Sequence, residues 1–257
     1  MLGKLLKQEW KATSRILLPL YMVLACTTLM AALLVHWDNN FKHVITMISM
    51  MPYVISLVLI AAGTTILLYV HFYKNLLTNE GYLMFTLPVK TNQLVFSKLL
   101  TSFLLTSVSI AAIFFSAFLV ACASGNYQAV INGLHSALAE LKTGTGLSTP
   151  LLILEFIVLF IVCALSNILT VYFAIALGQL FTGHRIIGAF VSYGVLYVAF
   201  QLLSLIAMGI LILMKGMDYA EQADNTIFLI MIPLAILINC ACYYGTVKIL
   251  RTKLNLE

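Results

Sequence analysis

Charge is what this chain has least of. Only 9% of its 257 residues are charged, whereas soluble globular domains carry about 25%. Hydrophobic residues make up 62%, and they recur in runs that match the roughly 20 apolar residues a helix needs to cross a hydrocarbon core. This balance excludes an ordinary soluble protein and indicates an all-α membrane protein that crosses the bilayer several times.

The sequence also lacks the motifs of the common catalytic classes. No Walker A, H-E-x-x-H or G-x-S-x-G pattern occurs in it. The five histidines are scattered over predicted loops, and the five cysteines lie in or beside apolar runs, so neither type is grouped as metal ligands or a catalytic triad would be. We therefore expect no catalytic residue, metal or cofactor in this chain. The net charge of +5 does not imply a nucleic-acid partner, because basic residues in loops also set membrane topology.

Six apolar segments of a single domain, 1–257, have the length of membrane spans. They cover about 16–35, 44–70, 99–122, 150–181, 186–214 and 226–247. Most of the basic residues fall on one side of these spans, namely Lys4, Lys7, Lys11, Arg15, Lys74, Lys90, Lys98, Arg185, Lys248, Arg251 and Lys253. Only Lys42, Lys142 and Lys215 fall on the other side. Because basic loops stay inside, we predict that both termini are cytoplasmic.

Residues 1–15 have the pattern of an amphipathic helix that lies in the membrane interface. One face carries Lys4, Lys7, Lys11 and Arg15, and the other carries Leu2, Leu5, Leu6 and Trp10. Glu9 falls among the apolar residues, which is out of pattern. Either it reaches water at a frayed interface, or it meets a basic residue of a partner or of another cytoplasmic loop.

The stretch 71–98, between the second and third spans, is too apolar for a free cytosolic loop. Gly81 permits a turn and Pro88 bars a continuous helix, so we expect a short helix, a break, a second short helix and a restart after Thr91. This stretch either packs on lipid as an interfacial helix or docks in a groove of a soluble protein, where Glu80 would meet a basic residue.

Few polar residues interrupt the spans. The one charge inside an apolar run is Glu155, near the expected outer end of its span, which is thin support for an ion relay. Candidates for a substrate path are Glu155, Asn167, Gln201 and Asn239, although such groups also serve as hydrogen-bonding contacts between helices. The pairs Ala174/Gly178 and Gly188/Ser192 have the spacing of close helix contacts, and Val130, Leu134, Leu138 and Leu141 recur as on a short outer helix. A stand-alone secondary transporter or channel, or a non-transporting scaffold, remains an alternative.

Four blocks of the sequence resemble a known family. Glu9–Tyr21, Tyr73–Lys90, Phe173–Arg185 and Lys253–Glu257 resemble the small permeases of the type-2 ABC exporter class from Gram-positive bacteria. The chain is similar to permeases of phenol-soluble-modulin exporters, and lantibiotic-immunity permeases are similar in size. The resemblance implies a permease dimer, expected as a homodimer, in the bacterial cytoplasmic membrane. Two cytosolic ATPase subunits would bind ATP and Mg and hydrolyse the ATP. The complex would export a hydrophobic or amphipathic substrate, such as a peptide toxin that acts in virulence or an antimicrobial peptide.

The resemblance also assigns roles to residues. It implies that 1–15, with Glu9, Trp10, Lys11 and Arg15, forms an elbow helix along the membrane. It implies that 71–98 supplies the helix that couples to the ATPase, with Lys74, Asn79, Glu80, Gly81, Tyr82, Phe85 and Pro88 as its candidate residues. The chain departs from the family at Asn79, where many relatives have an acidic residue. It departs again at Lys215–Asn225, which is short for the outer hairpin of well-known type-2 permeases, whereas Ser124–Thr149 is long.

Overall fold

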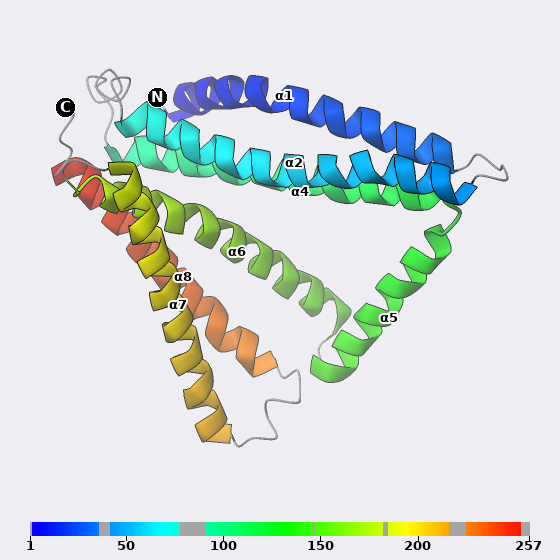
Figure 1. The fold of residues 1–257 in the computed structure, drawn as a ribbon. Helices are drawn as coiled ribbons and strands as arrows, with labels where there is room; N and C mark the ends of the chain where they lie inside the picture. The colour runs from blue at the N-terminus through cyan, green and yellow to red at the C-terminus, as the bar shows by residue number, and fades with distance from the viewer. Residues whose placement is uncertain are drawn as a thin grey trace. The chain divides into compact units, whose positions relative to one another are not determined.

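The computed structural model describes residues 2–35, 42–77, 91–145, 148–181, 185–215 and 225–252. Over these ranges the chain forms seven α-helices and no strand. They are α1 (Leu2–Val35), α2 (Lys42–Leu77), α4 (Thr91–Ala123), α5 (Tyr127–Thr145), α6 (Thr149–Gly178), α7 (Arg185–Lys215) and α8 (Asn225–Thr252) (Figure 1).

Six of these helices are long and apolar enough to cross a membrane, and α5 is the exception. The candidate spans are Leu5–Val35, Met47–Asn75, Thr91–Ala123, Thr149–Gly178, Arg185–Leu213 and Ile230–Thr252. Their large side chains are widely exposed, as on Phe114, Phe190 and Leu213, which fits helices solvated by lipid. The prediction of an all-α, multi-pass membrane protein is thereby confirmed, whereas the side on which the termini lie stays a prediction.

Five of the six spanning helices are longer than the apolar runs alone suggested, whereas α6 ends at Gly178, three residues before the predicted end of its run. α1 begins at Leu2 and continues without a break through Pro19, and α4 begins at Thr91. At 1.5 Å per residue, a span of about 30 residues reaches roughly 45 Å, well beyond a 30 Å hydrocarbon core. Polar residues near the helix ends can therefore lie at the level of the lipid headgroups.

The chain divides into two compact units. Unit 1 comprises Met1–His71 and Phe96–His135, and unit 2 comprises Phe72–Val95 and Ser136–Glu257. In unit 1, α1, α2 and α4 lie side by side along their length (Figure 1). Buried residues recur on α1 at helical spacing as Glu9, Thr13, Leu17, Leu24, Thr28 and Ala31, so one stripe of this helix faces its neighbours.

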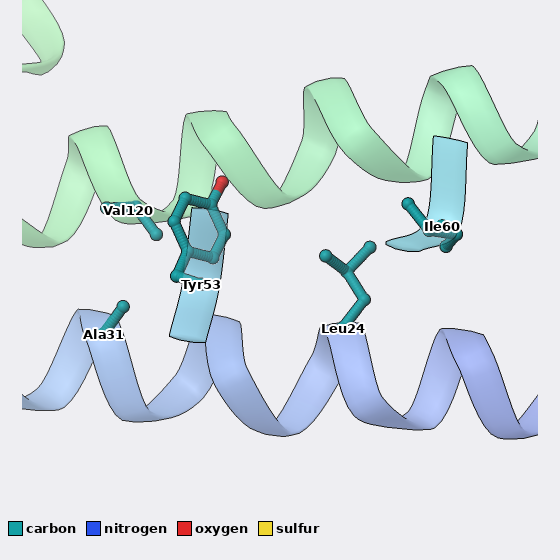
Figure 2. Packing of buried hydrophobic residues seen from close by; sticks show 5 residues of the cluster. All are labelled: Leu24, Ala31, Tyr53, Ile60 and Val120. Atoms are coloured by element: carbon teal, nitrogen blue, oxygen red, sulfur yellow. The ribbon is translucent and has the colours of Figure 1, made fainter. Parts of the chain in front are cut away.

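Two apolar clusters hold the three helices of unit 1 together. Leu17, Leu68 and Leu105 form one, with one residue from each helix. The other comprises Leu24, Ala31, Tyr53, Ile60 and Val120, and Figure 2 shows Tyr53 between α1 and α4.

A hydroxyl pair also joins each two of these helices. Tyr21 Oη lies 2.7 Å from Ser109 Oγ, Thr27 Oγ1 lies 2.8 Å from Ser56 Oγ, and Tyr53 Oη lies 3.2 Å from Ser116 Oγ. In lipid, such hydrogen bonds are a main source of helix association because the hydrophobic effect does not favour it.

In unit 2, α6 packs against both α7 and α8. The helices approach closely at glycines: a Cβ added to Gly178 would lie 2.6 Å from the backbone nitrogen of Ala189, and one added to Gly245 would lie 2.5 Å from the Phe173 ring. Gly188 meets the Phe181 ring in the same way. The close helix contact predicted from the small-residue spacing at Gly178 is confirmed, whereas Gly188 meets a side chain that follows the end of α6.

Candidate functional site

The most unusual local arrangement in unit 1 is a cluster of three ionisable side chains from three helices. Glu9 of α1 accepts a hydrogen bond from Lys98 Nζ of α4, with 2.6 Å between Nζ and Oε1. Its other oxygen, Oε2, lies 2.7 Å from Nε2 of His71 on α2. One carboxylate thus joins α1 to both other helices of the unit. We call this set the Glu9 cluster.

The cluster is shielded from solvent. Glu9 is 5% exposed and Lys98 2%, and the His71 side chain is 19% exposed. Buried charges are costly unless they are paired and hydrogen-bonded, and the cluster provides both of these. Ionisable residues within membrane spans usually face the interior of a bundle and pair with one another, as these do.

The position of Glu9 follows from helical spacing. Glu9, Thr13 and Leu17 are four residues apart, and all three are buried on the face of α1 that meets α2 and α4. The neighbouring Trp10 is 38% exposed, and Lys11 is exposed as well. Glu9 is out of the amphipathic pattern because it lies on the side of α1 that faces the bundle. Of the two interpretations given for Glu9, the structure supports contact with basic residues and not exposure to water at a frayed interface.

The cluster lies at one end of the bundle. His71 is within about two turns of the end of α2 at Leu77, and Lys98 within about two turns of the start of α4 at Thr91. The chain between these two helix ends is the stretch 78–90, whose candidate coupling residues Asn79, Glu80, Gly81, Tyr82, Phe85 and Pro88 lie outside the described residues. Lys74, the remaining coupling candidate, is exposed on α2. Two members of the Glu9 cluster, His71 and Lys98, thus lie on either side of the 78–90 stretch along the chain.

The elbow-helix candidates lie on a continuous helix. Lys11, Arg15 and Trp10 are exposed on α1, whereas Glu9 is buried. Since α1 has no interruption from Leu2 to Val35, residues 2–15 are its first turns and not a separate helix. That these turns lie along the membrane stays a prediction.

In the described part of unit 2, the hydrogen bonds of Asn167 and Asn239 do not connect the candidates for a substrate path with one another. Asn239 of α8 is buried and its Nδ2 donates to the Val162 carbonyl oxygen of α6, at 3.3 Å. Asn167 is exposed and donates to the Cys163 carbonyl of its own helix, at 2.9 Å. Asn239 therefore acts as a contact between helices. Glu155 is half-buried near the start of α6, and Gln201 is exposed on α7.

Sequence reasoning missed two members of the Glu9 cluster. His71 and Lys98 were assigned to the ends of a cytoplasmic stretch, and Glu155 was taken as the one charge inside an apolar run. By length and composition, Glu9 and Lys98 also fall within the candidate spans Leu5–Val35 and Thr91–Ala123, near one end of each helix. The available signal was Lys98 itself, a cation among Leu94, Val95, Leu99 and Leu100 that needs a buried partner.

The last residues of α2 and the first residues of α4 belong to unit 2, and they make an aromatic contact and a hydrogen bond there. The rings of Phe72 and Tyr172 stack with centroids 3.7 Å apart and planes at 13°. The Tyr243 hydroxyl of α8 hydrogen-bonds to the Asn92 side chain on α4. Residues on both sides of the 78–90 stretch thus contact α6 or α8.

Among the described residues there is no group of three His, Cys, Asp or Glu side chains that could hold a metal ion. Comparison of the chain with protein-family models gave no match. Comparison with curated proteins and with solved structures gave none either.

Proposed function

We propose that this chain is the transmembrane permease subunit of an ATP-driven ABC exporter in a bacterial cytoplasmic membrane. Two cytosolic ATPase subunits bind ATP and Mg, and each docks on the 78–90 stretch of one permease in a homodimer. ATP-driven closure of the ATPase pair moves that stretch and shifts the permease dimer between inward-facing and outward-facing states. The ATPase activity belongs to the partner chain.

The observation that carries this proposal is the Glu9 cluster. It joins both helices that flank the 78–90 stretch to the N-terminal helix, through bonds of 2.6 and 2.7 Å in a site shielded from solvent. A displacement applied to Glu80 or its neighbours would move α1, α2 and α4 together, because no two of them can separate at this end without exposing a buried charge. Mechanical coupling requires a rigid base of this kind.

The substrate class follows from the surface that the spans present. Exposed side chains on α7 are almost all apolar, with Phe190, Val195, Leu205 and Leu213 among them, and described polar residues such as Gln201 are few. Spans with so few polar side chains offer few contacts to ions or sugars, which favours hydrophobic or amphipathic molecules as cargo. We propose amphipathic peptides, either toxins or antimicrobial peptides, as the cargo.

The proposal is tested by co-purification in mild detergent with the ABC ATPase that we expect a neighbouring reading frame to encode. The test variant combines Glu80→Ala with Tyr82→Ala. Its matched control combines Glu221→Ala with Tyr219→Ala, which removes the same two side-chain types from the predicted outer loop. The expected result is that the test variant loses ATPase binding or peptide-stimulated ATP hydrolysis, whereas the control behaves as wild type.

Failure has a clear form. If no ABC ATPase binds the wild-type chain, the exporter assignment is wrong. If the ATPase binds and the test variant couples as well as the control, the stretch is an interfacial helix packed on lipid. If ATP hydrolysis ignores every amphipathic peptide, the cargo class is wrong while the subunit assignment stands.

A second function has one observation in its favour. Ionisable residues buried within membrane spans are typical of proton relays, so the Glu9 cluster is compatible with a proton-coupled carrier that works alone. In that case efflux from vesicles would collapse with a protonophore and persist without ATP. The exporter predicts the reverse. The position of the cluster close to the helix ends favours the exporter, because carriers hold their coupling groups near the bilayer midplane.

A further inference from the structure

Helix α5 has a continuous apolar stripe. The residues of this stripe are Tyr127, Val130, Ile131, Leu134, Leu138 and Leu141. At 100° per residue they fall within an arc of about 100°, in which the one polar residue is Thr145, at the last position of the helix. Lys142 and His135 lie just beyond one edge of this arc, and Gln128, Asn132, Ser136, Glu140 and Thr143 occupy the rest of the helix.

The described parts of the chain leave the stripe largely uncovered. Tyr127 is 45% exposed, Val130 38%, Ile131 41% and Leu134 60%. A row of exposed large apolar side chains, bordered by polar ones, marks an interaction surface. The question is what covers it.

Chain connectivity restricts the answer. α4 ends at Ala123 and α5 begins at Tyr127, whereas α5 ends at Thr145 and α6 begins at Thr149. Each connection spans at most about 14 Å. Both flanking helices are candidate spans, and both are apolar up to these ends, with Phe118–Cys122 closing one and Leu151–Leu154 opening the other.

Both ends of α5 are therefore held at one surface of the membrane. A helix of 19 residues is about 28 Å long, and short connections at each end leave it no freedom to stand upright. Three candidate spans precede it, which puts it on the membrane face opposite the N-terminus. The bilayer surface is the one partner within reach wherever the chain is inserted.

We propose that α5 lies along this membrane surface with its stripe inserted at the level of the lipid headgroups. Leu134 and its neighbours bury their side chains among the acyl chains. Lys142, at the edge of the stripe, places its ammonium group near lipid phosphates. This assignment is independent of the exporter proposal, since it holds for any protein that contains the spans α4 and α6.

The test uses the full-length chain in vesicles of phosphatidylethanolamine and phosphatidylglycerol. Tryptophan is the reporter, in a background with Trp10→Phe and Trp37→Phe. Leu134→Trp places it on the stripe, and Asn132→Trp places it on the opposite side of the same helix turn. Quenching by lipids brominated near the headgroup is compared with quenching by aqueous acrylamide. If Leu134→Trp fails to fold, Tyr127→Trp replaces it.

We expect Leu134→Trp to emit at shorter wavelength and to be quenched several-fold more by brominated lipid than Asn132→Trp, with the opposite order for acrylamide. Equal quenching at the two positions would overturn the proposal. Protection of Leu134→Trp from both quenchers would also overturn it, because the stripe would then be covered by protein, such as a second copy of this chain.

Discussion

The two units of this protein hold their helices together in different ways. Buried polar side chains are concentrated in unit 1, where hydroxyl pairs and the Glu9 cluster connect α1, α2 and α4. Unit 2 has only Ser192, Asn239 and Thr246 as buried polar side chains in its described part, and its helices approach through Gly178 and Gly245.

The difference shows two answers to one physical problem. Apolar side chains gain little by leaving lipid for protein, so helices in a membrane associate through hydrogen bonds or through close van der Waals packing. Unit 1 adds hydrogen bonds between helices to its two apolar clusters, and these bonds fix the rotation and register of each helix. Unit 2 relies mainly on the close approach of its helices, which is possible because glycine has no Cβ at the contact positions. Substitutions should therefore act oppositely: unit 1 loses stability when polar atoms are removed, and unit 2 when carbon atoms are added.

The largest effect is expected at the ion pair of unit 1. Lys98→Met leaves the Glu9 carboxylate buried beside His71 without its cation, and should cost about 3–5 kcal/mol of the free energy of unfolding. SDS titration in mixed micelles measures this. Lys11→Met, an exposed lysine on α1, serves as the matched control and should change stability by less than about 0.5 kcal/mol.

A second substitution at the same ion pair should restore stability. Glu9→Gln combined with Lys98→Met removes both charges, so the double variant should recover much of the stability that Lys98→Met loses. A double variant as unstable as Lys98→Met would show that Lys98 acts through its packing and not through its charge.

A smaller loss is expected at the helix crossing of unit 2. Gly178→Ala places a Cβ 2.6 Å from a backbone nitrogen of α7, which cannot move away as a side chain can, and should cost about 1–3 kcal/mol. Gly194→Ala on α7, which has open space around it, should leave stability unchanged or slightly raised. Unfolding of both variants under the same conditions decides the matter. Equal stability would mean that the α6–α7 approach is loose.

The smallest effect is expected at a single hydroxyl pair. Ser109→Ala removes the partner of Tyr21, and a double-mutant cycle with Tyr21→Phe should give a coupling of about 0.6 kcal/mol, the usual size for such bonds in membrane proteins. A coupling near zero would leave the apolar clusters and the ion pair as the forces that hold α1 to α4.

Much of the fold could be predicted from the sequence. Five of the six predicted apolar runs lie within an observed helix, and the run 150–181 extends three residues past the end of α6 at Gly178. The restart after Thr91 and the helical spacing of Val130 to Leu141 match α4 and α5. The close contact at Gly178 was visible as small-residue spacing. The ends of the helices were harder to predict from the sequence. A helix continues through polar residues as long as its backbone hydrogen bonds persist, as α1 does from Leu2.

The candidate site was predicted only in part. Glu9 stood out because a carboxylate broke an amphipathic pattern, but nothing local indicated which cation it meets. His71 and Lys98 lie far from it in sequence, and their distances to Glu9 depend on how three helices are rotated against one another.

The sequence by itself determined that this protein is surrounded by lipid. Its apolar runs are long enough to cross a bilayer, and so many of them have no stable arrangement in water. It also determined where the helices lie, because in lipid each must satisfy its backbone bonds internally. Tertiary structure alone decided which helix faces meet. The lipid-facing and protein-facing sides of these helices are similarly apolar, so pairing is set by a few hydroxyls, glycines and one buried carboxylate whose partners come from distant parts of the chain.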